Sequence, residues 1–263
     1  MNILKRELRA GLKPFILWTI GMFALVFGGI YKFQGIGAEG VDINMLLDQF
    51  PRPVLAVMGM VGVDISTLGG YTSILLYYVL ICAVIYAVHI GSSAVTRESL
   101  DKTYEFIFTK PVSRGRILAM KLTAGWIYQF IFSALTVVFS IVAVSTLERT
   151  ETITVPIILF ALSIFLIASL FIALSVFIAA LVKQSDKGSL YGNLAFLYAF
   201  ILGVIYDMLE NGGLLRLISP FKYFLAADLL DNQFDPLYTV ISIALTAALL
   251  FGAFRLFKRR DLT

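Results

Sequence analysis

The chain has 263 residues, of which 59% are hydrophobic and only 14% charged, and its mean hydropathy is +0.90. Soluble domains contain roughly 45–50% apolar and about 25% charged residues, so this composition excludes a soluble enzyme and indicates a protein that lies mostly in a bilayer. The net charge of +4 does not indicate nucleic-acid binding, because the basic residues border apolar runs rather than forming one solvated stripe.

The first predicted element is an amphipathic helix over residues 1–13 that lies on the membrane surface. Leu4, Leu8 and Leu12 recur at every fourth position, which places them on one helical face. The basic residues of this elbow helix fall opposite them: Lys5, Arg6 and Arg9. The alternative is a tail whose positive charges only fix the orientation of the protein. No A-x-A cleavage site follows, so we expect an uncleaved first span rather than a secretory signal.

Six apolar runs are long enough to cross a bilayer as helices, which takes about 20 mostly apolar residues. They cover residues 14–31, 71–95, 122–146, 155–182, 190–206 and 237–257. Arg255, in the last turn of the sixth run, is the only Asp, Glu, Lys or Arg in any of them and can extend to the surface. The sequence therefore predicts an all-α, polytopic membrane protein with six transmembrane helices in one transmembrane domain, residues 1–263.

The distribution of the 21 Lys and Arg residues predicts the orientation of these spans. Most of them lie before the first span, in residues 96–121, in residues 183–189 and after the sixth span. With six spans, these four segments all lie on the same side of the membrane as the two termini. We therefore expect both termini to be cytoplasmic, and residues 32–70 and 207–236 to form extracytoplasmic loops.

Both extracytoplasmic loops are long enough to hold short helices. In the first, apolar residues between Leu47 and Met58 fall on one helical face that two prolines interrupt, which predicts a kinked interfacial helix. In the second, the apolar stretch 214–230 is broken near its middle by Pro220, which predicts an interfacial or partly inserted segment.

The second span carries a semi-polar stripe whose residues are spaced by three or four. They are Tyr78, Cys82, Tyr86, His89 and Ser93. Such a face could line a path for amphipathic substrates, but more commonly it is a packing face with hydrogen bonds to neighbouring helices. For the amides Gln129 and Asn193, within the third and fifth spans, we also expect hydrogen bonds between helices.

The inner loop, residues 96–121, combines charged and aromatic side chains before it breaks at Pro111. Its charged residues include Arg97, Glu98, Asp101, Lys102, Glu105, Lys110 and Arg114. Its aromatic residues are Tyr104, Phe106 and Phe108. Aromatic residues and Arg are favoured at the cores of protein interfaces, so this loop suits the docking of another protein. Equally, the aromatic residues could anchor the ends of the second and third spans at the bilayer surface.

The sequence offers no catalytic residues, no metal site and no nucleotide site. It has no Gly-Lys dipeptide, so the phosphate-binding loop G-x-x-x-x-G-K-[ST] is absent. One histidine and one cysteine cannot form a multi-histidine or a thiolate metal site. His89 with Ser92 or Ser93 could resemble a hydrolase pair, but no carboxylate lies within helical reach in the membrane. The lack of Asp and Glu in the spans also weighs against an ion-coupled carrier.

The order of these parts resembles the type 2 (ABC-2 type) permease subunits of ATP-binding-cassette (ABC) exporters, in which six spans form half of a transporter. Residues 98–114 read ESLDKTYEFIFTKPVSR and are similar to that family's E-x-x-x-x-T-x-E-x-L-x-x-x-P-x-x-R element after the second span. Ile107 and Phe108 stand near the position where the family often has Leu, and they keep its apolar character. Weaker similarities lie at residues 118–121, Ser219-Pro220-Phe221 with Tyr223 and Phe224, and residues 257–262.

The resemblance implies that residues 97–110 form a coupling helix seated in a groove of a separate cytoplasmic ATPase subunit. The helix of residues 1–13 and the loop 183–188 would add contacts. This chain would bind no cofactor itself, because ATP and Mg would bind in the partner ATPase. A second permease copy or a paralogue, two ATPases and membrane lipids would complete the assembly in a cell membrane, which we expect to be a bacterial plasma membrane.

The resemblance also implies a function, namely ATP-driven export. The lack of buried charge favours amphipathic or hydrophobic cargo, such as a drug, a lipid or a membrane-active peptide, over small ions. Two alternatives remain open on the sequence. One is a membrane scaffold or sensor that recruits a cytoplasmic partner without transport, and the other is a passive channel or secondary carrier that needs no nucleotide.

Overall fold

The computed structural model describes residues 3–36, 43–47, 49–100, 113–147, 152–182, 184–209 and 212–259. These residues form helices and no strand. The long helices are α1 (Ile3–Ile36), α4 (Leu68–Leu100), α6 (Arg114–Ser145), α7 (Thr154–Leu181), α8 (Ser185–Met208) and α11 (Pro236–Arg259). All six are long and apolar enough to cross a membrane, which confirms the predicted all-α fold with six spans.

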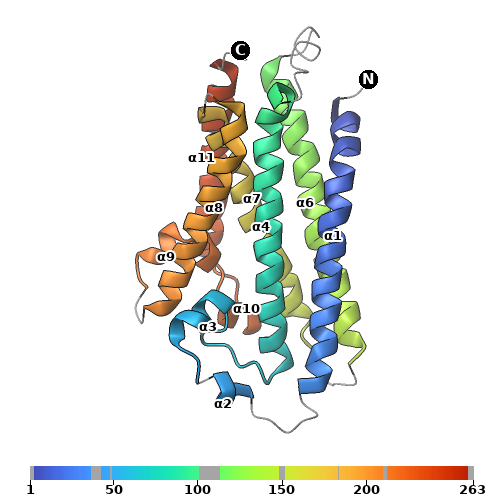
Figure 1. Cartoon of the computed structure of the whole chain (residues 1–263), viewed down its shortest axis with the longest axis vertical. Helices are drawn as coiled ribbons and strands as arrows, with labels where there is room; N and C mark the ends of the chain where they lie inside the picture. Colours follow the sequence, from blue (N-terminus) through green and yellow to red (C-terminus); the bar gives the residue numbers. More distant parts are fainter. Residues whose placement is uncertain are drawn as a thin grey trace.

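Five short helical segments connect the long ones: α2 (Ile43–Leu47), α3 (Arg52–Met58), α9 (Leu215–Ile218), the 3-10 helix η1 (Pro220–Lys222) and α10 (Ala226–Leu230). Figure 1 shows that they gather at one end of the bundle, which we call the loop end. Both chain ends lie at the opposite end, which we call the terminal end. This arrangement agrees with an even number of spans, while the side of the membrane that each end faces remains a prediction.

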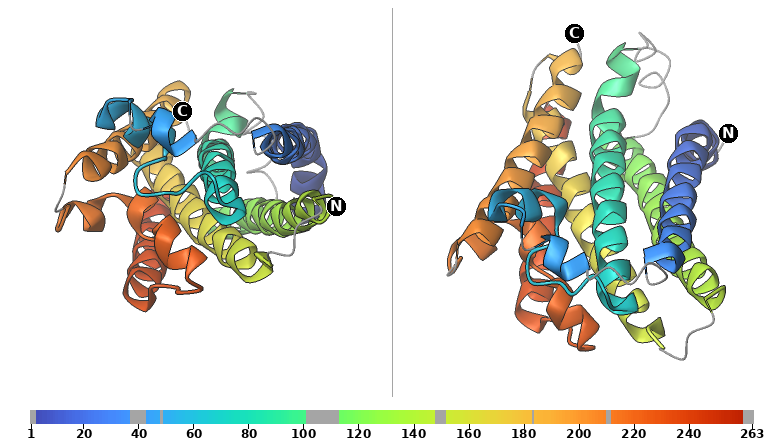
Figure 2. Two further views of the ribbon diagram at one scale, coloured as in Figure 1. Left: turned by 90° about the horizontal axis from the view of Figure 1, so that it is seen from below. Right: turned by 60° about the horizontal axis from the view of Figure 1, so that its bottom comes forward.

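The centre of the bundle is the pair α4 and α7, which pack against each other more extensively than any other two helices (Figure 2). In the most apolar 18-residue stretch of each helix, 61% of the residues of α4 and 67% of those of α7 are buried. The corresponding share is 17% in α1 and in α11, which lie at the periphery. Close approach requires Gly91 of α4, because a Cβ there would lie 2.5 Å from the carbonyl oxygen of Ile172. Ser175 of α7 also donates a hydrogen bond to the carbonyl of Val88, 2.9 Å away. Small residues and a short interhelical hydrogen bond are the usual basis of helix packing in lipid.

The structure corrects one part of the prediction for residues 1–13, namely that they form a helix separate from the first span. These residues continue into the first span as one helix of 34 residues, α1, with Pro14 inside it. Such a helix is about 51 Å long, whereas the hydrocarbon core is about 30 Å thick, so it is longer than one crossing needs. The position of its first turns at the membrane surface remains a prediction. The helix packs along α6 beside the proline, and Gly11 lies directly against the ring of Tyr128.

The other predicted spans lie in the observed helices, with one boundary clearly different. α6 begins at Arg114, eight positions before the predicted start at Leu122. Its start is fixed by Ser113, whose hydroxyl accepts a hydrogen bond from the backbone N–H of Arg116 at 3.4 Å. An apolar run ends at the edge of the bilayer, but a capped helix continues beyond it. The length of such a helix is therefore underestimated when only its apolar residues are counted.

The loop end is held by local polar contacts between its short helices and the start of α4. The carboxylate of Asp64 accepts hydrogen bonds from the Ser66 hydroxyl at 2.6 Å and from the Asn44 amide of α2 at 2.7 Å. These hydrogen bonds hold the pKa of Asp64 below its usual value, and the bond from the Ser66 hydroxyl has the largest effect. The two short helices α2 and α3, with Pro51 between them, match the kinked helix that the sequence predicts.

The amide of Gln129, on α6, is fully buried at 0% exposure. Neither its oxygen nor its nitrogen has a hydrogen-bond partner among the described residues, so the expected interhelical hydrogen bond is wrong for this amide. An unsatisfied buried polar group costs about 1–3 kcal/mol. We therefore expect Gln129→Leu to raise the midpoint of thermal unfolding by about 2–6 °C.

The control for this variant is Thr136→Val on the same helix. Thr136 is equally buried, but its hydroxyl donates to the carbonyl of Phe132 at 2.9 Å. Removing a satisfied hydroxyl should therefore give no comparable gain. Both variants can be followed by thermal unfolding in detergent, and a Gln129→Leu protein less stable than the wild type would contradict the prediction.

Candidate functional site

The predicted coupling segment connects α4 to α6 at the terminal end. Of its candidate residues, the structure describes the side chains of Arg97 and Arg114 and the backbone of Glu98. The others lie outside the described residues: Asp101, Lys102, Tyr104, Glu105, Phe108 and Lys110. Arg97 is three positions from the end of α4, and Arg114 is the first residue of α6. Both ends of the segment therefore emerge where the chain termini lie (Figure 1).

Polar contacts join the helices from which this segment emerges. Glu7 of α1 is buried and forms an ion pair with Arg97 of α4 at 3.6 Å and another with its neighbour Arg6 at 2.7 Å. Lys121 of α6 is also buried, and its ammonium donates to the carbonyl oxygen of Ala94 of α4 at 3.0 Å. These contacts join α1, α4 and α6 into one unit at the terminal end.

A third connection joins α1 directly to α6. The hydroxyl of Tyr128 donates a hydrogen bond to the carbonyl oxygen of Leu8, and the centre of the Tyr128 ring lies 4.8 Å from that of Phe15, with the two rings tilted by 32°. Of the predicted elbow residues, Arg6 is half-buried beside Glu7, whereas Lys5 and Arg9 are exposed. The first turns of α1 are thus packed on one side and basic on the other.

A cleft opens between these helices, and we call it the terminal-end cleft. Its first chamber, of about 400 Å³, lies between α1, α4 and α6, with Glu7, Arg97 and Lys121 in its wall. Its second chamber, of about 620 Å³, lies between α1, α4 and α8 and includes Lys13 and Trp18. The two chambers share Pro14, His89 and Ser189. Figures 1 and 2 show α4 lying between α1 and α8, so the cleft follows the face of α4 between its two neighbours.

The stripe of α4 predicted from the sequence is divided along the bundle. Near the loop end, Tyr78 donates a hydrogen bond to the carbonyl of Met58 at 3.0 Å, and Cys82 is partly buried. Tyr86 is buried, with its ring 6.0 Å from that of Trp18 of α1.

At the terminal end, His89 is exposed and lines both chambers, while Ser93 lines the first. Because Tyr86 also lines the first chamber, the structure brings three of the five stripe residues to the cleft. A role in a substrate path remains a prediction. The expectation for Asn193 is wrong, because its exposed amide donates to Ser189 within the same helix at 2.9 Å.

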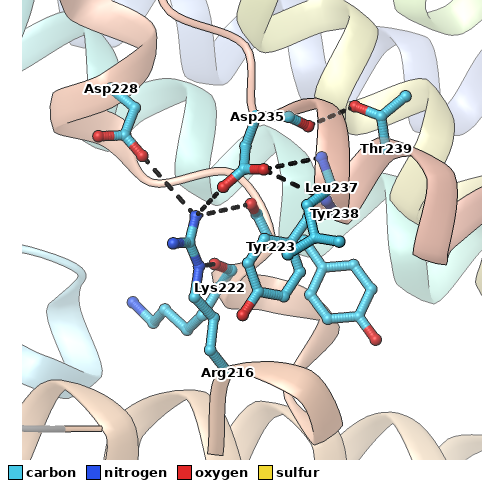
Figure 3. A network of polar contacts seen from close by, with 8 residues as sticks. All are labelled: Arg216, Lys222, Tyr223, Asp228, Asp235, Leu237, Tyr238 and Thr239. Carbon is cyan, nitrogen blue, oxygen red and sulfur yellow. Dashed lines mark hydrogen bonds and ion pairs between the residues drawn. The ribbon is translucent and has the colours of Figure 1, made fainter. Parts of the chain in front are cut away.

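The loop end contains a second polar centre, formed by Arg216 of α9 (Figure 3). Its guanidinium donates to the carbonyl oxygens of Lys222 at 3.0 Å and Tyr223 at 3.1 Å. It also forms ion pairs with Asp235 at 3.2 Å and Asp228 at 3.7 Å. One planar group thus joins α9, η1, α10 and the start of α11. The guanidinium of Arg can do this because it carries several N–H donors in a fixed planar arrangement.

Asp235 has a second role, because it caps α11. Its other carboxylate oxygen accepts from the backbone N–H groups of Leu237 at 3.0 Å and Tyr238 at 3.3 Å (Figure 3). Pro236 at the first helical position is preorganised for this start. The Tyr238 ring lies 4.2 Å from the Arg216 guanidinium carbon, a cation–π contact.

An ion pair between Lys222 of η1 and Asp207 of α8 lies beside this network. Only 11% and 12% of the two side chains are exposed. The Lys222 ammonium also lies 5.7 Å from the centre of the Tyr77 ring of α4, and Arg52 of α3 donates to the carbonyl of Asp207 at 3.1 Å. The pair lines a chamber of about 250 Å³ at the loop end. It connects the irregular segment after α8 to the centre of the bundle.

Sequence reasoning missed this loop-end centre. Arg216 and Lys222 are isolated charges inside an otherwise apolar stretch, and Asp207, Asp228 and Asp235 surround them in sequence. Charges that interrupt a stretch near the membrane are expected to pair with one another, so the signal was present. The partners could not be assigned, because five acidic residues in this segment, Glu210 and Asp231 among them, were available to two basic ones.

We expect Arg216→Met to lower the free energy of unfolding by about 1–3 kcal/mol, because it leaves two carbonyls and the Asp235 carboxylate without their shared donor. Arg216→Lys should recover only part of the loss, because an ammonium lacks the planar fork. Lys32→Gln, which removes an exposed basic side chain near the loop end of α1, is the control. Thermal unfolding in detergent checks all three, and an Arg216→Met protein as stable as the control would contradict the assignment.

Comparison with known proteins was made at the level of families and of individual sequences. A family model described as ABC-2 family transporter protein matches residues 1–262. No curated protein matches the chain. The family match covers the cleft, both ends of the α4–α6 connection and the loop-end centre.

Proposed function

Since the chain belongs to the ABC-2 family of transporter proteins, we propose that it is a permease subunit driven by a separate cytoplasmic ABC ATPase bound at its terminal end. The family is a multi-pass membrane component of transporters, and the chain has six helices that can cross a membrane. ATP and Mg bind in the partner, because this sequence lacks the phosphate-binding loop.

The charge of the two ends supports a cytoplasmic terminal end. Basic side chains of the described residues gather there: Lys5, Arg6, Arg9, Lys13, Arg97, Arg114, Arg116, Lys121, Lys187 and Lys258. The loop end is richer in acidic residues: Asp64, Asp207, Asp228, Asp231 and Asp235. Lys and Arg near the ends of spans favour the cytoplasmic side. The coupling segment, residues 96–121, would then face the cytoplasm and the ATPase.

One observation favours the α4–α6 connection as the place where force enters. Its two ends are fastened to each other by the Lys121–Ala94 hydrogen bond, and to α1 by the Glu7–Arg97 ion pair. A displacement of the connection would therefore move three helices together instead of being absorbed by one loop. Because α4 packs extensively on α7, the motion would reach the centre of the bundle.

In this mechanism the ATPase works through differential affinity for two arrangements of the bundle. ATP brings the two ATPases together, the docked segments move, and the helices shift between inward and outward openings. A partner can drive such a change only if it binds one arrangement more tightly than the other. The assembly has two permeases, identical or paralogous, and two ATPases.

The cargo we propose is amphipathic or hydrophobic and is exported. The described spans carry no acidic residue near mid-membrane, which suits a drug, a lipid or a membrane-active peptide better than a small ion. The location we propose is a bacterial plasma membrane.

The test is purification of the chain with tagged ABC ATPases from the same cell, followed by ATP hydrolysis assays in lipid. The proposal expects one ATPase to co-purify and its hydrolysis rate to depend on the permease. A scaffold would bind the ATPase without changing its turnover. A channel or secondary carrier would move substrate into vesicles without nucleotide. Either result would overturn the proposal.

A further inference from the structure

The chamber of about 250 Å³ at the loop end lies between α4, α7, α8 and η1, and we call it the loop-end chamber. Its wall combines aromatic and aliphatic side chains with the Lys222–Asp207 ion pair. We propose that this chamber binds an uncharged aromatic molecule that carries a hydroxyl group. The inference goes beyond the proposed function, because it concerns binding alone and holds whether or not an ATPase docks at the terminal end.

Two polar atoms on the wall of the chamber have no hydrogen-bond partner among the described residues. One is the hydroxyl oxygen of Tyr77. The other is Oδ1 of Asp207, because the contact of this carboxylate with Lys222 uses Oδ2. Neither atom is sealed off by the protein around it. Both are therefore accessible to a ligand.

Lys222 brings these two side chains together. Its ammonium pairs with the Asp207 carboxylate and lies 5.7 Å from the centre of the Tyr77 ring. A carboxylate oxygen only accepts hydrogen bonds, so the ligand must supply a donor, whereas a tyrosine hydroxyl can donate or accept. One hydroxyl group on the ligand matches both atoms, since it donates one hydrogen bond and accepts others.

The rest of the wall suits an aromatic ring. The ring of Phe221 lies 5.6 Å from that of Phe171 and 6.0 Å from that of Phe196, and Phe224 stacks on Phe234 at 4.5 Å. These contacts hold the rings in place before a ligand arrives, which lowers the cost of binding. The other large apolar side chains of the wall are Val61, Leu76, Leu80, Phe160 and Ile164.

The volume of the chamber limits the ligand to a small molecule. An engineered apolar cavity of about 150 Å³ is large enough to bind benzene. The larger loop-end chamber therefore suits two fused rings, of about ten to twelve non-hydrogen atoms.

The ion pair favours a ligand without charge. Lys222 and Asp207 are the only charged side chains among the described residues of the wall, and they neutralise each other. Only 11% and 12% of the two side chains are exposed. A charged ligand would have to break this pair or bring an uncompensated charge into a poorly hydrated place, and either is costly.

The probe for this site is 2-naphthol, which has two fused rings, one hydroxyl group and no charge at neutral pH. Equilibrium dialysis of the radiolabelled compound against the full chain in nanodiscs measures its binding, and empty nanodiscs give the partition into lipid to be subtracted. We expect saturable binding that is about tenfold tighter than that of naphthalene, which lacks the hydroxyl. The anion 2-naphthoate should show no saturable binding.

Tyr77→Phe should weaken the binding of 2-naphthol about tenfold and leave that of naphthalene unchanged. Its thermal unfolding should match the wild type, because the hydroxyl that it removes has no partner among the described residues. Tyr71→Phe is the matched control. Tyr71 is also half-buried on α4 and its hydroxyl has no such partner, but it lies outside the chamber. This variant should bind 2-naphthol as the wild type does.

Four results would overturn the proposal. The first is an absence of saturable 2-naphthol binding beyond the partition into empty nanodiscs. The second is equal affinity for 2-naphthol and naphthalene, which would assign the chamber to a purely apolar occupant such as a lipid chain. The third is equal or tighter binding of 2-naphthoate, which would assign it to an anion. The fourth is a Tyr77→Phe protein that binds 2-naphthol no more weakly than Tyr71→Phe does.

Discussion

Replacing Lys222 by methionine is expected to lower the free energy of unfolding by about 3–5 kcal/mol, the largest stability effect of any single change considered for this chain. The substitution leaves the carboxylate of Asp207 buried at 12% exposure without the ammonium that neutralises it. It also removes the cation from the Tyr77 ring and loosens the contact between η1 and α8. Thermal unfolding of the purified protein in nanodiscs measures the loss.

The double variant Lys222→Met with Asp207→Leu is the matched control. Replacing both members of a buried ion pair by apolar groups is often neutral, so the double variant should recover most of the stability that the single variant loses. A double variant that is no more stable than Lys222→Met would show that the loss comes from packing and not from an uncompensated charge.

The second large effect concerns energy coupling. Glu98→Gln, Glu105→Gln and Arg114→Gln should each reduce ATP-driven transport by about tenfold or more, since a charge pair that is broken in an interface costs about 2–5 kcal/mol. ATP hydrolysis by the ATPase should continue, because its catalytic residues are untouched. Efflux of amphipathic dyes and labelled lipids from inverted vesicles, measured beside phosphate release, gives both quantities.

The control for this series is Lys258→Gln. Lys258 lies near the end of α11 at the terminal end and is exposed, but it belongs to neither the coupling segment, residues 96–121, nor the cleft. It should leave transport and hydrolysis at wild-type levels. Unchanged transport in all three coupling variants would count against the α4–α6 connection as the ATPase contact.

The six spans could be predicted from the sequence because each apolar run is long and nearly free of charge, and no soluble helix needs such a run. The kink in the first long loop was predictable for a similar reason, since proline between two apolar segments ends a helix. The family resemblance, based on residues 98–114, is confirmed by the family model that matches residues 1–262.

The course of α1 could not be predicted in the same way. The leucine spacing and Pro14 were compatible with a separate surface helix, and only contacts with α6 decide otherwise, through Tyr128 on Leu8 and on Gly11. These contacts join residues more than 100 positions apart in sequence. Local patterns contain no information about such partners.

The features of the candidate site also differ in whether local sequence patterns could predict them. The basic, aromatic composition of residues 96–121 was visible in the sequence, and so was the stripe that includes His89. The terminal-end cleft was not visible, because it depends on α4 lying between α1 and α8. The pairing of Lys222 with Asp207, and of Arg216 with Asp235, was also hidden, because it requires the irregular segment after α8 to fold back onto the bundle.

The central claim is that a cytoplasmic ATPase acts on the permease through residues 96–121. Its most direct test is photo-crosslinking in intact cells from a benzophenone amino acid at position 104, with the adduct identified by mass spectrometry. The account predicts an adduct with an ABC ATPase that the Arg114→Gln variant weakens. An adduct with an extracytoplasmic protein, or efficient crosslinking to other proteins without any ATPase, would contradict it.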